Sequence, residues 1–442
     1  MNSTKTNYTV PFIIITVLFF LWGFITVLVD SLVPRLREVF ELTYFQAGLV
    51  QFAFFLAYFV FSIPAGVLLS KVGYKKGIII GLSTMAIGCL LFYPASSERI
   101  FGVFLLAYFT LAAGITILQV AANPYVAVLG SEDGAGSRLN LAQAFNSLGT
   151  AIAPIAGAAF LLSDKILTSQ EITVLTEVER ESYYISEAGA VQTPFLFFAG
   201  LIALLAVAFI FIKLPQLQKT AKSGYSALLK KTSVWMGAAG IFVYVGAEVA
   251  IGSYLVNYFI DLNLEETIRN NETMGGIASF FLNADINDID AKAVVGAFLF
   301  FYWTGAMVGR FIGSALMRFI APFKVLMTFT ALAILMIMIS VSSPGLMAMW
   351  SILAVGLFNS IMFPTIFTLT LNGLGDLKPQ ASGLLCMAIV GGAIVPISFG
   401  ALADSLGFAL AFLLPMACYA YIMFFAFYKG RKINNPTAAV AS

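Results

Sequence analysis

GTAIAPIAG (149–157) has a counterpart far along the chain, GGAIVPISFG (391–400), and the pair indicates an internal repeat. Each segment surrounds a proline with small residues inside an apolar run. Chance similarity between apolar helices is the alternative. We interpret the pair as a trace of two related halves in one chain.

A second pair of positions keeps a common spacing. Gln119 lies five residues before Pro124, and Asn359 lies five residues before Pro364. A proline inside an apolar helix frees a backbone carbonyl, which is tolerated where polar groups line a cavity. Two related bundles with a polar midplane are typical of secondary transporters built from parallel repeats.

Composition places the chain in a membrane. The sequence has 442 residues, of which 60% are hydrophobic and 10% are charged. Soluble domains carry roughly 25% charged residues. A soluble protein of this composition could not cover its surface with polar groups, so we predict an integral membrane protein. The net charge is only +2 and no basic tract occurs, so nucleic acid is not an expected partner.

Apolar runs long enough to span a bilayer, about 20 residues each, occur twelve times. They fall near 11–33, 45–69, 77–95, 101–129, 139–162, 194–213, 234–260, 292–317, 323–341, 346–373, 380–402 and 406–428. The sequence therefore predicts an all-α membrane protein with twelve transmembrane helices in two six-helix bundles. The predicted domains are an N-terminal bundle, a basic cytoplasmic linker and a C-terminal bundle: 1–213, 214–233 and 234–442.

The distribution of basic residues predicts the topology. If both termini are cytoplasmic, most of the 24 lysines and arginines fall on the inner side, as the positive-inside rule requires. The acidic residues then gather in two long external loops near 163–193 and 261–291. The first apolar run lacks a small-residue cleavage site, so we interpret it as a retained helix. We expect a multi-pass protein of the inner cell membrane.

Two carboxylates lie inside predicted spans, Asp30 in the first and Glu248 in the seventh. A charge at the bilayer centre costs roughly 2.5–3.5 kcal/mol on insertion scales, and such residues commonly mark ion or substrate paths. Both are therefore candidates for cation coupling. The alternatives are structural ion pairs, of Asp30 with Arg35 or Arg37 and of Glu248 with Arg310.

Polar side chains cluster on the fourth, fifth and seventh predicted spans. Amides both donate and accept hydrogen bonds, which suits the hydroxyl groups of a sugar, and aromatic rings suit its apolar faces. The alternative is that these amides only join helix to helix. The predicted sugar-binding residues are Gln119, Asn123, Asn140, Gln143, Asn146, Tyr254, Asn257, Asn359 and Trp22.

A loop motif recurs after the second and eighth spans, as GVLLSKVGYKKG (66–77) and GRFIGSALMRFIAPFK (309–324). It resembles the cytoplasmic loop motif of the major facilitator superfamily, although Ser70 stands where that family usually has an acid. Glycines let helices approach closely, and basic side chains can pair with acids or helix C-termini. The alternative is that these basic residues only fix topology. We predict that three of them form the gate: Lys71, Lys75 and Arg310.

Several longer segments are similar to one branch of that superfamily, the fucose/glucose/galactose:cation symporters. The segments are FLWGF (20–24), DSLVP (30–34), RLNLAQAFNSLG (138–149) and YVGAEVAIGSYLVNYF (244–259). The resemblance implies cation-coupled uptake of a hexose, and Asp30 matches the family's aspartate in the first span. Gln119 stands where fucose-specific members have an acid, whereas Glu248 resembles the glucose/galactose branch. The resemblance thus favours glucose or galactose over fucose, mannose or N-acetylglucosamine.

The expected mechanism is alternating access, with a proton or sodium ion as the coupling ion, a possible Na⁺ near Glu248 and no other cofactor. An exporter of drugs or metabolites and a sugar sensor are the alternatives. An enzyme is not expected, because the chain has no histidine and no paired acids at motif spacing. The expected partners are a hexose and the bilayer, and the expected state is a monomer.

Overall fold

The computed structural model describes residues 8–39, 44–98, 100–161, 174–215 and 224–434. Within these ranges the side chains of 29–39, 44, 45, 47, 48, 51, 155–161, 187, 188, 190, 191 and 434 lie outside the description. The chain forms two compact units. Unit 1 comprises 1–131, 148–231 and 373–387, and unit 2 comprises 132–147, 232–372 and 388–442.

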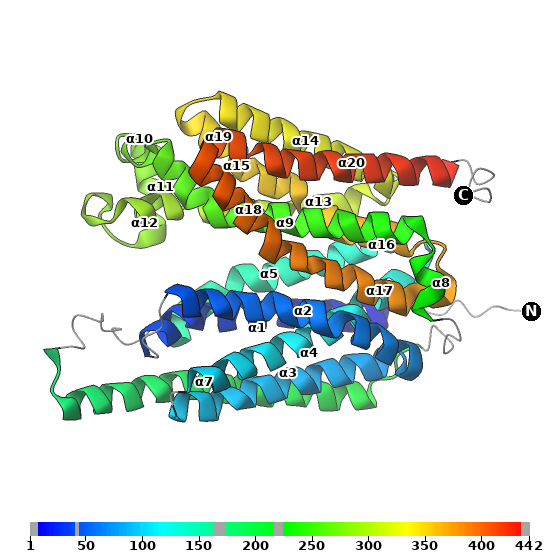
Figure 1. The fold of residues 1–442 in the computed structure, drawn as a ribbon, viewed down its shortest axis with the longest axis horizontal. Helices are drawn as coiled ribbons and strands as arrows, with labels where there is room; N and C mark the ends of the chain where they lie inside the picture. Colours follow the sequence, from blue (N-terminus) through cyan, green and yellow to red (C-terminus); the bar gives the residue numbers. More distant parts are fainter. Residues whose placement is uncertain (1–7, 40–43, 99, 162–173, 216–223, 435–442) are drawn as a thin grey trace, which may run out of the picture. The chain divides into compact units, whose positions relative to one another are not determined.

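Unit 1 is built from long apolar helices. Its elements are α1 (Thr9–Val39), α2 (Tyr44–Val72), α3 (Tyr74–Ser97), α4 (Phe101–Val128), α7 (Glu177–Phe211), α8 (Tyr225–Leu229), η2 (Gly375–Leu377) and α17 (Lys378–Met387). Helix α3 packs against α4 and α7, and α2 packs against α4 and α17 (Figure 1). Glycine allows the α3–α4 approach: a Cβ on Gly114 would lie 2.4 Å from the backbone nitrogen of Met85.

Unit 2 is centred on α9 (Thr232–Asp261), which packs against α16, α18 and α20. Helix α5 (Ala135–Leu161) begins in this unit, and its residues from 148 onward belong to unit 1. The other elements are α10 (Leu264–Arg269), α11 (Glu272–Leu282), η1 (Ile286–Asp288), α12 (Ala291–Gly296), α13 (Leu299–Leu316), α14 (Pro322–Ser342), α15 (Gly345–Asn359), α16 (Met362–Leu371), η3 (Ala388–Val390), α18 (Gly391–Leu406), α19 (Phe408–Ala411) and α20 (Leu413–Asn434).

The predicted spans all have helical counterparts. Among the described residues, eleven helical segments are long and apolar enough to cross a membrane. The remaining predicted span, 139–162, is the fifth in chain order and corresponds to α5. The first half of α5 is rich in polar side chains and is therefore less hydropathic. The all-α membrane architecture is confirmed. The division into 1–213, 214–233 and 234–442 stays a prediction.

The two prolines of the repeated amide–proline spacing, Pro124 and Pro364, have different effects on their helices. Pro364 lacks an N–H, so it cannot bond the carbonyl of Ser360, and the helix is interrupted there between α15 and α16. Its repeat partner Pro124 lies inside the continuous helix α4. The carbonyl that Pro124 leaves free, that of Val120, accepts a hydrogen bond of 2.8 Å from the Ser382 hydroxyl of α17.

The predicted external loops contain helices. Helix α7 begins at Glu177, well before the apolar window 192–211, and α10, α11 and η1 occupy most of 261–291. In the second segment the Arg269 guanidinium donates to the Glu265 carboxylate and to the carbonyls of Ile286 and Ile289, the last at 2.7 Å. These bonds tie the ends of the segment together, so it is a folded cap on unit 2 rather than an open loop.

The three cysteines are buried thiols. Cys89, Cys386 and Cys418 lie in α3, α17 and α20, and each is free and buried.

Helix α7 starts with a capping box whose stability we expect to depend on pH. Thr176 accepts from the Glu179 amide, and the Glu179 carboxylate accepts from the Thr176 amide at 3.0 Å and from its hydroxyl at 2.8 Å. These hydrogen bonds lower the pKa of Glu179 below its ordinary value. The box is therefore complete at neutral pH and is lost as the pH falls through that lowered value.

Hydrogen exchange measures this effect. We expect the amides of the first turn of α7 to lose protection at acidic pH, while amides inside the apolar part of α7 keep theirs. Thr176→Ala serves as the control, because it removes the box at every pH and should flatten the difference. Equal pH dependence in the parent and in this variant would contradict the prediction.

Candidate functional site

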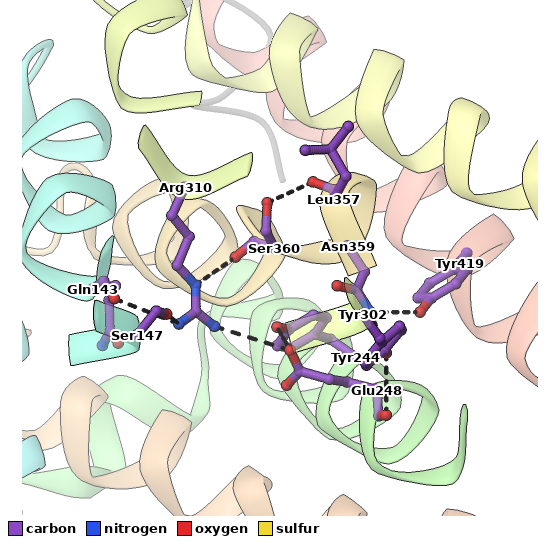
Figure 2. A network of polar contacts seen from close by, with 10 residues as sticks. All are labelled: Gln143, Ser147, Tyr244, Glu248, Tyr302, Arg310, Leu357, Asn359, Ser360 and Tyr419. Atoms are coloured by element: carbon purple, nitrogen blue, oxygen red, sulfur yellow. Dashed lines mark hydrogen bonds and ion pairs between the residues drawn. The ribbon is translucent and has the colours of Figure 1, made fainter. Parts of the chain in front are cut away.

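Glu248 lies near the middle of α9, and its closest partner comes from the same helix. The Tyr244 hydroxyl, one turn earlier, donates to Glu248 Oε1 at 2.6 Å (Figure 2). Residues four apart share a helix face, so this spacing brings the two groups together. A short O–H···O⁻ bond of this length is typical of an ionised acceptor.

The Arg310 guanidinium on α13 faces the same carboxylate. Arg310 Nη2 lies 3.9 Å from Glu248 Oε1, and each side chain is only 14% exposed. The pair of Glu248 with Arg310, the alternative to a coupling role, is therefore present as an ion pair whose atoms are beyond hydrogen-bond distance. The coupling role of Glu248 stays a prediction. Breaking a buried pair by removing one partner leaves an uncompensated charge, so the two residues depend on each other.

Arg310 also binds three groups outside the carboxylate. Its Nε donates to the carbonyl of Ser360 at 3.1 Å, at the break between α15 and α16. Its Nη1 donates to the Ser147 hydroxyl and, at 3.5 Å, to the carbonyl of Gln143 on α5. One planar guanidinium therefore joins α5, α9, α13 and the break (Figure 2).

Asn359 lies beside this group. Its Nδ2 donates to the hydroxyls of Tyr302 at 2.9 Å and Tyr419 at 3.2 Å. The Tyr302 hydroxyl donates in turn to the backbone carbonyl of Glu248 at 3.3 Å. Asn359 is fully buried, and its Oδ1 has no hydrogen-bond partner among the described residues. Buried polar atoms are nearly always paired, so this oxygen is a candidate acceptor for a ligand hydroxyl.

The three predicted amides of α5 differ in their burial and in their contacts. Asn140 is buried, and its Nδ2 donates to the carbonyl of Gly136 at 2.9 Å and to the Thr365 hydroxyl of α16 at 3.2 Å. Asn140 thus bonds to another helix, while its Oδ1 has no hydrogen-bond partner among the described residues, so its place among the sugar-binding residues stays a prediction. Gln143 is buried and contributes its backbone carbonyl to Arg310, and Asn146 is half-buried.

Three predicted sugar-binding residues belong to unit 1. Gln119 Nε2 on α4 donates to the Tyr58 hydroxyl of α2 at 2.6 Å, and Asn123 is buried one turn further on. Trp22 is buried on α1 with its ring 5.3 Å from that of Phe19. The Gln119–Tyr58 bond has a counterpart in the Asn359–Tyr302 bond of unit 2, and each amide precedes a proline by five residues.

The other predicted residues lie outside both groups. The ring of Tyr254 packs on Phe399 at 5.3 Å, and Asn257 is exposed on α9. Lys75 donates to the Ile210 carbonyl at the end of α7 at 2.8 Å, as expected for a basic residue near a helix C-terminus. Lys71 is exposed. Asp30 belongs to α1, but its side chain lies outside the described residues.

Four residues of the unit 2 network were not predicted: Tyr244, Tyr302, Ser360 and Tyr419. Two of them carry a sequence signal. Tyr244 precedes Glu248 by four residues on a helix, and Ser360 precedes Pro364 by four, which marks it as the residue whose carbonyl is left free. Nothing in the sequence indicates Tyr419, because its role depends on how α20 packs against α9.

Comparisons with known proteins agree with this architecture. Residues 12–389 match the model of the Major Facilitator Superfamily. The chain is 48% identical over 430 residues to a protein of Brucella abortus biovar 1 (strain 9-941) named glucose/galactose transporter, covering 96% of this chain and 95% of that one. It is 36% identical over 444 residues to the L-fucose-proton symporter of Escherichia coli K12, covering 97% and 95%.

A solved structure gives the same result. The crystal structure of the Major Facilitator Superfamily transporter FucP in the outward conformation superimposes with a TM-score of 0.84 at 34% identity, covering 96% of this chain and 99% of that one. These relatives are transporters and not enzymes. The chain therefore belongs to the Major Facilitator Superfamily, in the family that includes the glucose/galactose transporters and the L-fucose-proton symporters.

Proposed function

We propose that this protein takes up a hexose, glucose or galactose first among them, together with a proton, by alternating access. The observation that carries the proposal is the contact of Glu248 with Arg310 and Tyr244, in which both charged side chains are only 14% exposed. A carboxylate that exchanges an arginine partner for a proton changes the charge of its surroundings without needing a cofactor. Such a change can drive a conformational transition only if the two states bind the proton with different affinity.

The surroundings of Glu248 favour a proton over a sodium ion. Hard cations bind several oxygen atoms at once. Here the oxygens of Ser147, Gln143 and Ser360 already accept from Arg310. A sodium ion beside the carboxylate would also meet the guanidinium charge at close range, whereas a proton joins the carboxylate directly. The name of the Escherichia coli relative, a fucose-proton symporter, points the same way.

Each unit carries predicted sugar-binding residues. In unit 2 the Oδ1 of Asn359, which has no partner among the described residues, supplies an acceptor, and Gln143 and Asn146 lie on α5 near the groups that accept from Arg310. In unit 1 Gln119 and Trp22 supply an amide and an aromatic face. We further propose that Lys71, Lys75 and Arg310 serve the inner gate.

The choice of sugar rests on the relatives and on one residue. The relative named for glucose and galactose is 48% identical and the one named for fucose is 36% identical. Gln119 is neutral and bonded to Tyr58, so unit 1 offers no acid at that position. L-Fucose is the second candidate. We also propose that the protein is a monomer of the inner membrane, with both termini in the cytoplasm.

Transport by purified protein in proteoliposomes tests the function. We expect labelled glucose to accumulate under an imposed pH gradient, acid outside, and not under an imposed sodium gradient. Galactose should compete strongly, and fucose and mannose weakly. Accumulation driven by sodium alone would overturn the proton assignment. Absence of sugar flux under both gradients would favour an exporter or a sensor.

A further inference from the structure

In each unit the repeated amide–proline segment leaves one backbone carbonyl without its helical hydrogen-bond donor. Pro124 and Pro364 have no N–H, so the carbonyls of Val120 and Ser360 lose their helical donors. A carbonyl without a donor is costly inside a membrane protein. In each unit a side chain from another helix donates a hydrogen bond to this carbonyl. The donor is neutral in one unit and charged in the other.

In unit 1 the donor is neutral. The Ser382 hydroxyl bonds the Val120 carbonyl at 2.8 Å, and α4 continues without interruption. In unit 2 the donor is charged. Arg310 Nε bonds the Ser360 carbonyl at 3.1 Å, and α15 and α16 are separated at this point. Only the unit 2 donor can therefore respond to a change of charge nearby.

The guanidinium is rigid, which links its contacts. Nε, Nη1 and Nη2 lie in one plane, so the group cannot turn toward one partner without changing its geometry at the others. Nη2 faces Glu248 Oε1 at 3.9 Å while Nε holds the Ser360 carbonyl. Figure 2 shows Arg310 between the carboxylate and the break.

We infer that Arg310 is a positioning residue that transmits the charge of Glu248 to the break between α15 and α16. This inference rests on the proposed function. When Glu248 is ionised, the carboxylate holds the guanidinium in the plane that serves Ser360. When Glu248 takes up a proton, that attraction is lost, the guanidinium keeps its bonds to Ser147 and Gln143 but leaves that plane, and the break rearranges. The titratable and charged groups that face Glu248 from α9, α13 and α20 are Tyr244, Tyr302, Arg310 and Tyr419.

The decisive variant is Pro364→Ala, which leaves Glu248 and Arg310 in place. The new amide can donate to the Ser360 carbonyl, so the break no longer needs Arg310. We expect pH-driven accumulation to fall from about tenfold per pH unit, the limit for one proton per sugar, to a ratio near 1. Exchange of labelled for unlabelled sugar at equal pH should persist. The matched control is Pro124→Ala in unit 1, which should keep the pH-driven ratio because its carbonyl is served by a neutral hydroxyl.

Arg310→Lys provides a second arm, with folding checked by circular dichroism. Lysine keeps a positive charge near Glu248 but has no fork that reaches two groups at once, so accumulation should be lost here too. A folded Pro364→Ala or Arg310→Lys protein with the parent's pH-driven ratio would overturn the inference, as would equal losses in Pro364→Ala and Pro124→Ala. Glu248→Gln distinguishes failure of this inference from failure of the proposed function. If this variant still accumulates sugar under the pH gradient, the proposal that Glu248 is the coupling acid fails.

Discussion

Glu248→Gln stops proton-driven accumulation of sugar, and this is the largest effect that we expect from any single substitution. Glutamine has nearly the same shape and can still accept a hydrogen bond from Tyr244, but it cannot take up a proton or balance Arg310. A transporter that moves one proton per sugar can build a ratio of about tenfold per pH unit. The variant should reach a ratio near 1, because its sugar movement no longer depends on the pH gradient.

Exchange of labelled for unlabelled sugar shows whether the Glu248→Gln variant has lost proton coupling or sugar binding. Preloaded proteoliposomes should still exchange labelled for unlabelled glucose, because alternation of the loaded protein does not require net proton movement. Glu272→Gln is the matched control: this acid is exposed at the start of α11, and its loss should leave accumulation unchanged. If Glu248→Gln accumulated sugar as the parent does, the coupling acid would have to be sought at Asp30.

Gly356→Ala should cause the second largest effect, on both stability and transport. Gly356 lies where α15 crosses α13, and a Cβ there would be 2.2 Å from the backbone oxygen of Tyr302. Backbone atoms cannot move aside as a side chain can, so the helices must separate. Overpacking of this kind costs about 1–3 kcal/mol. The displacement also moves Tyr302 away from Asn359 and from the Glu248 carbonyl.

Thermal unfolding of the detergent-solubilised protein measures the stability effect, and glucose uptake measures the functional one. Gly200→Ala is the matched control, because a Cβ on Gly200 of α7 would meet no atom within 4 Å. We expect the control to unfold near the parent temperature and Gly356→Ala to unfold several degrees lower with little uptake. Similar unfolding temperatures for the two variants would show that α13 and α15 separate at little cost.

The spans could be predicted from the sequence because one physical requirement, about 20 apolar residues, dominates them. The short helices of the predicted external loops do not meet that criterion. These helices are stabilised by the capping side chains of Asn271, Asp285 and Asp290 and by hydrogen bonds of the Arg269 guanidinium that reach across the segment. Such partners are close in space and cannot be found from hydropathy alone.

The charged residues of the site could be predicted from the sequence, but most of the hydrogen bonds that join them to other helices could not. Glu248 stood out because a carboxylate in a span is costly, and Arg310 was its evident partner. The link from Arg310 to the Ser360 carbonyl follows from Pro364 only once α13 is known to pack beside α15. The sequence places Asn140 among the sugar-binding amides by its spacing. Its bond to Gly136 lies within α5, and its bond to Thr365 follows only from packing within unit 2.

The buried thiols have a practical consequence for spectroscopy. Cys89 and Cys386 are fully buried and Cys418 is 6% exposed, so maleimide reagents meet no accessible native target in the folded protein. A pair of cysteines introduced at exposed positions, one in each unit, can then carry fluorophores while the native sequence is otherwise kept. Energy transfer between the two dyes would follow alternation during turnover in the wild-type background.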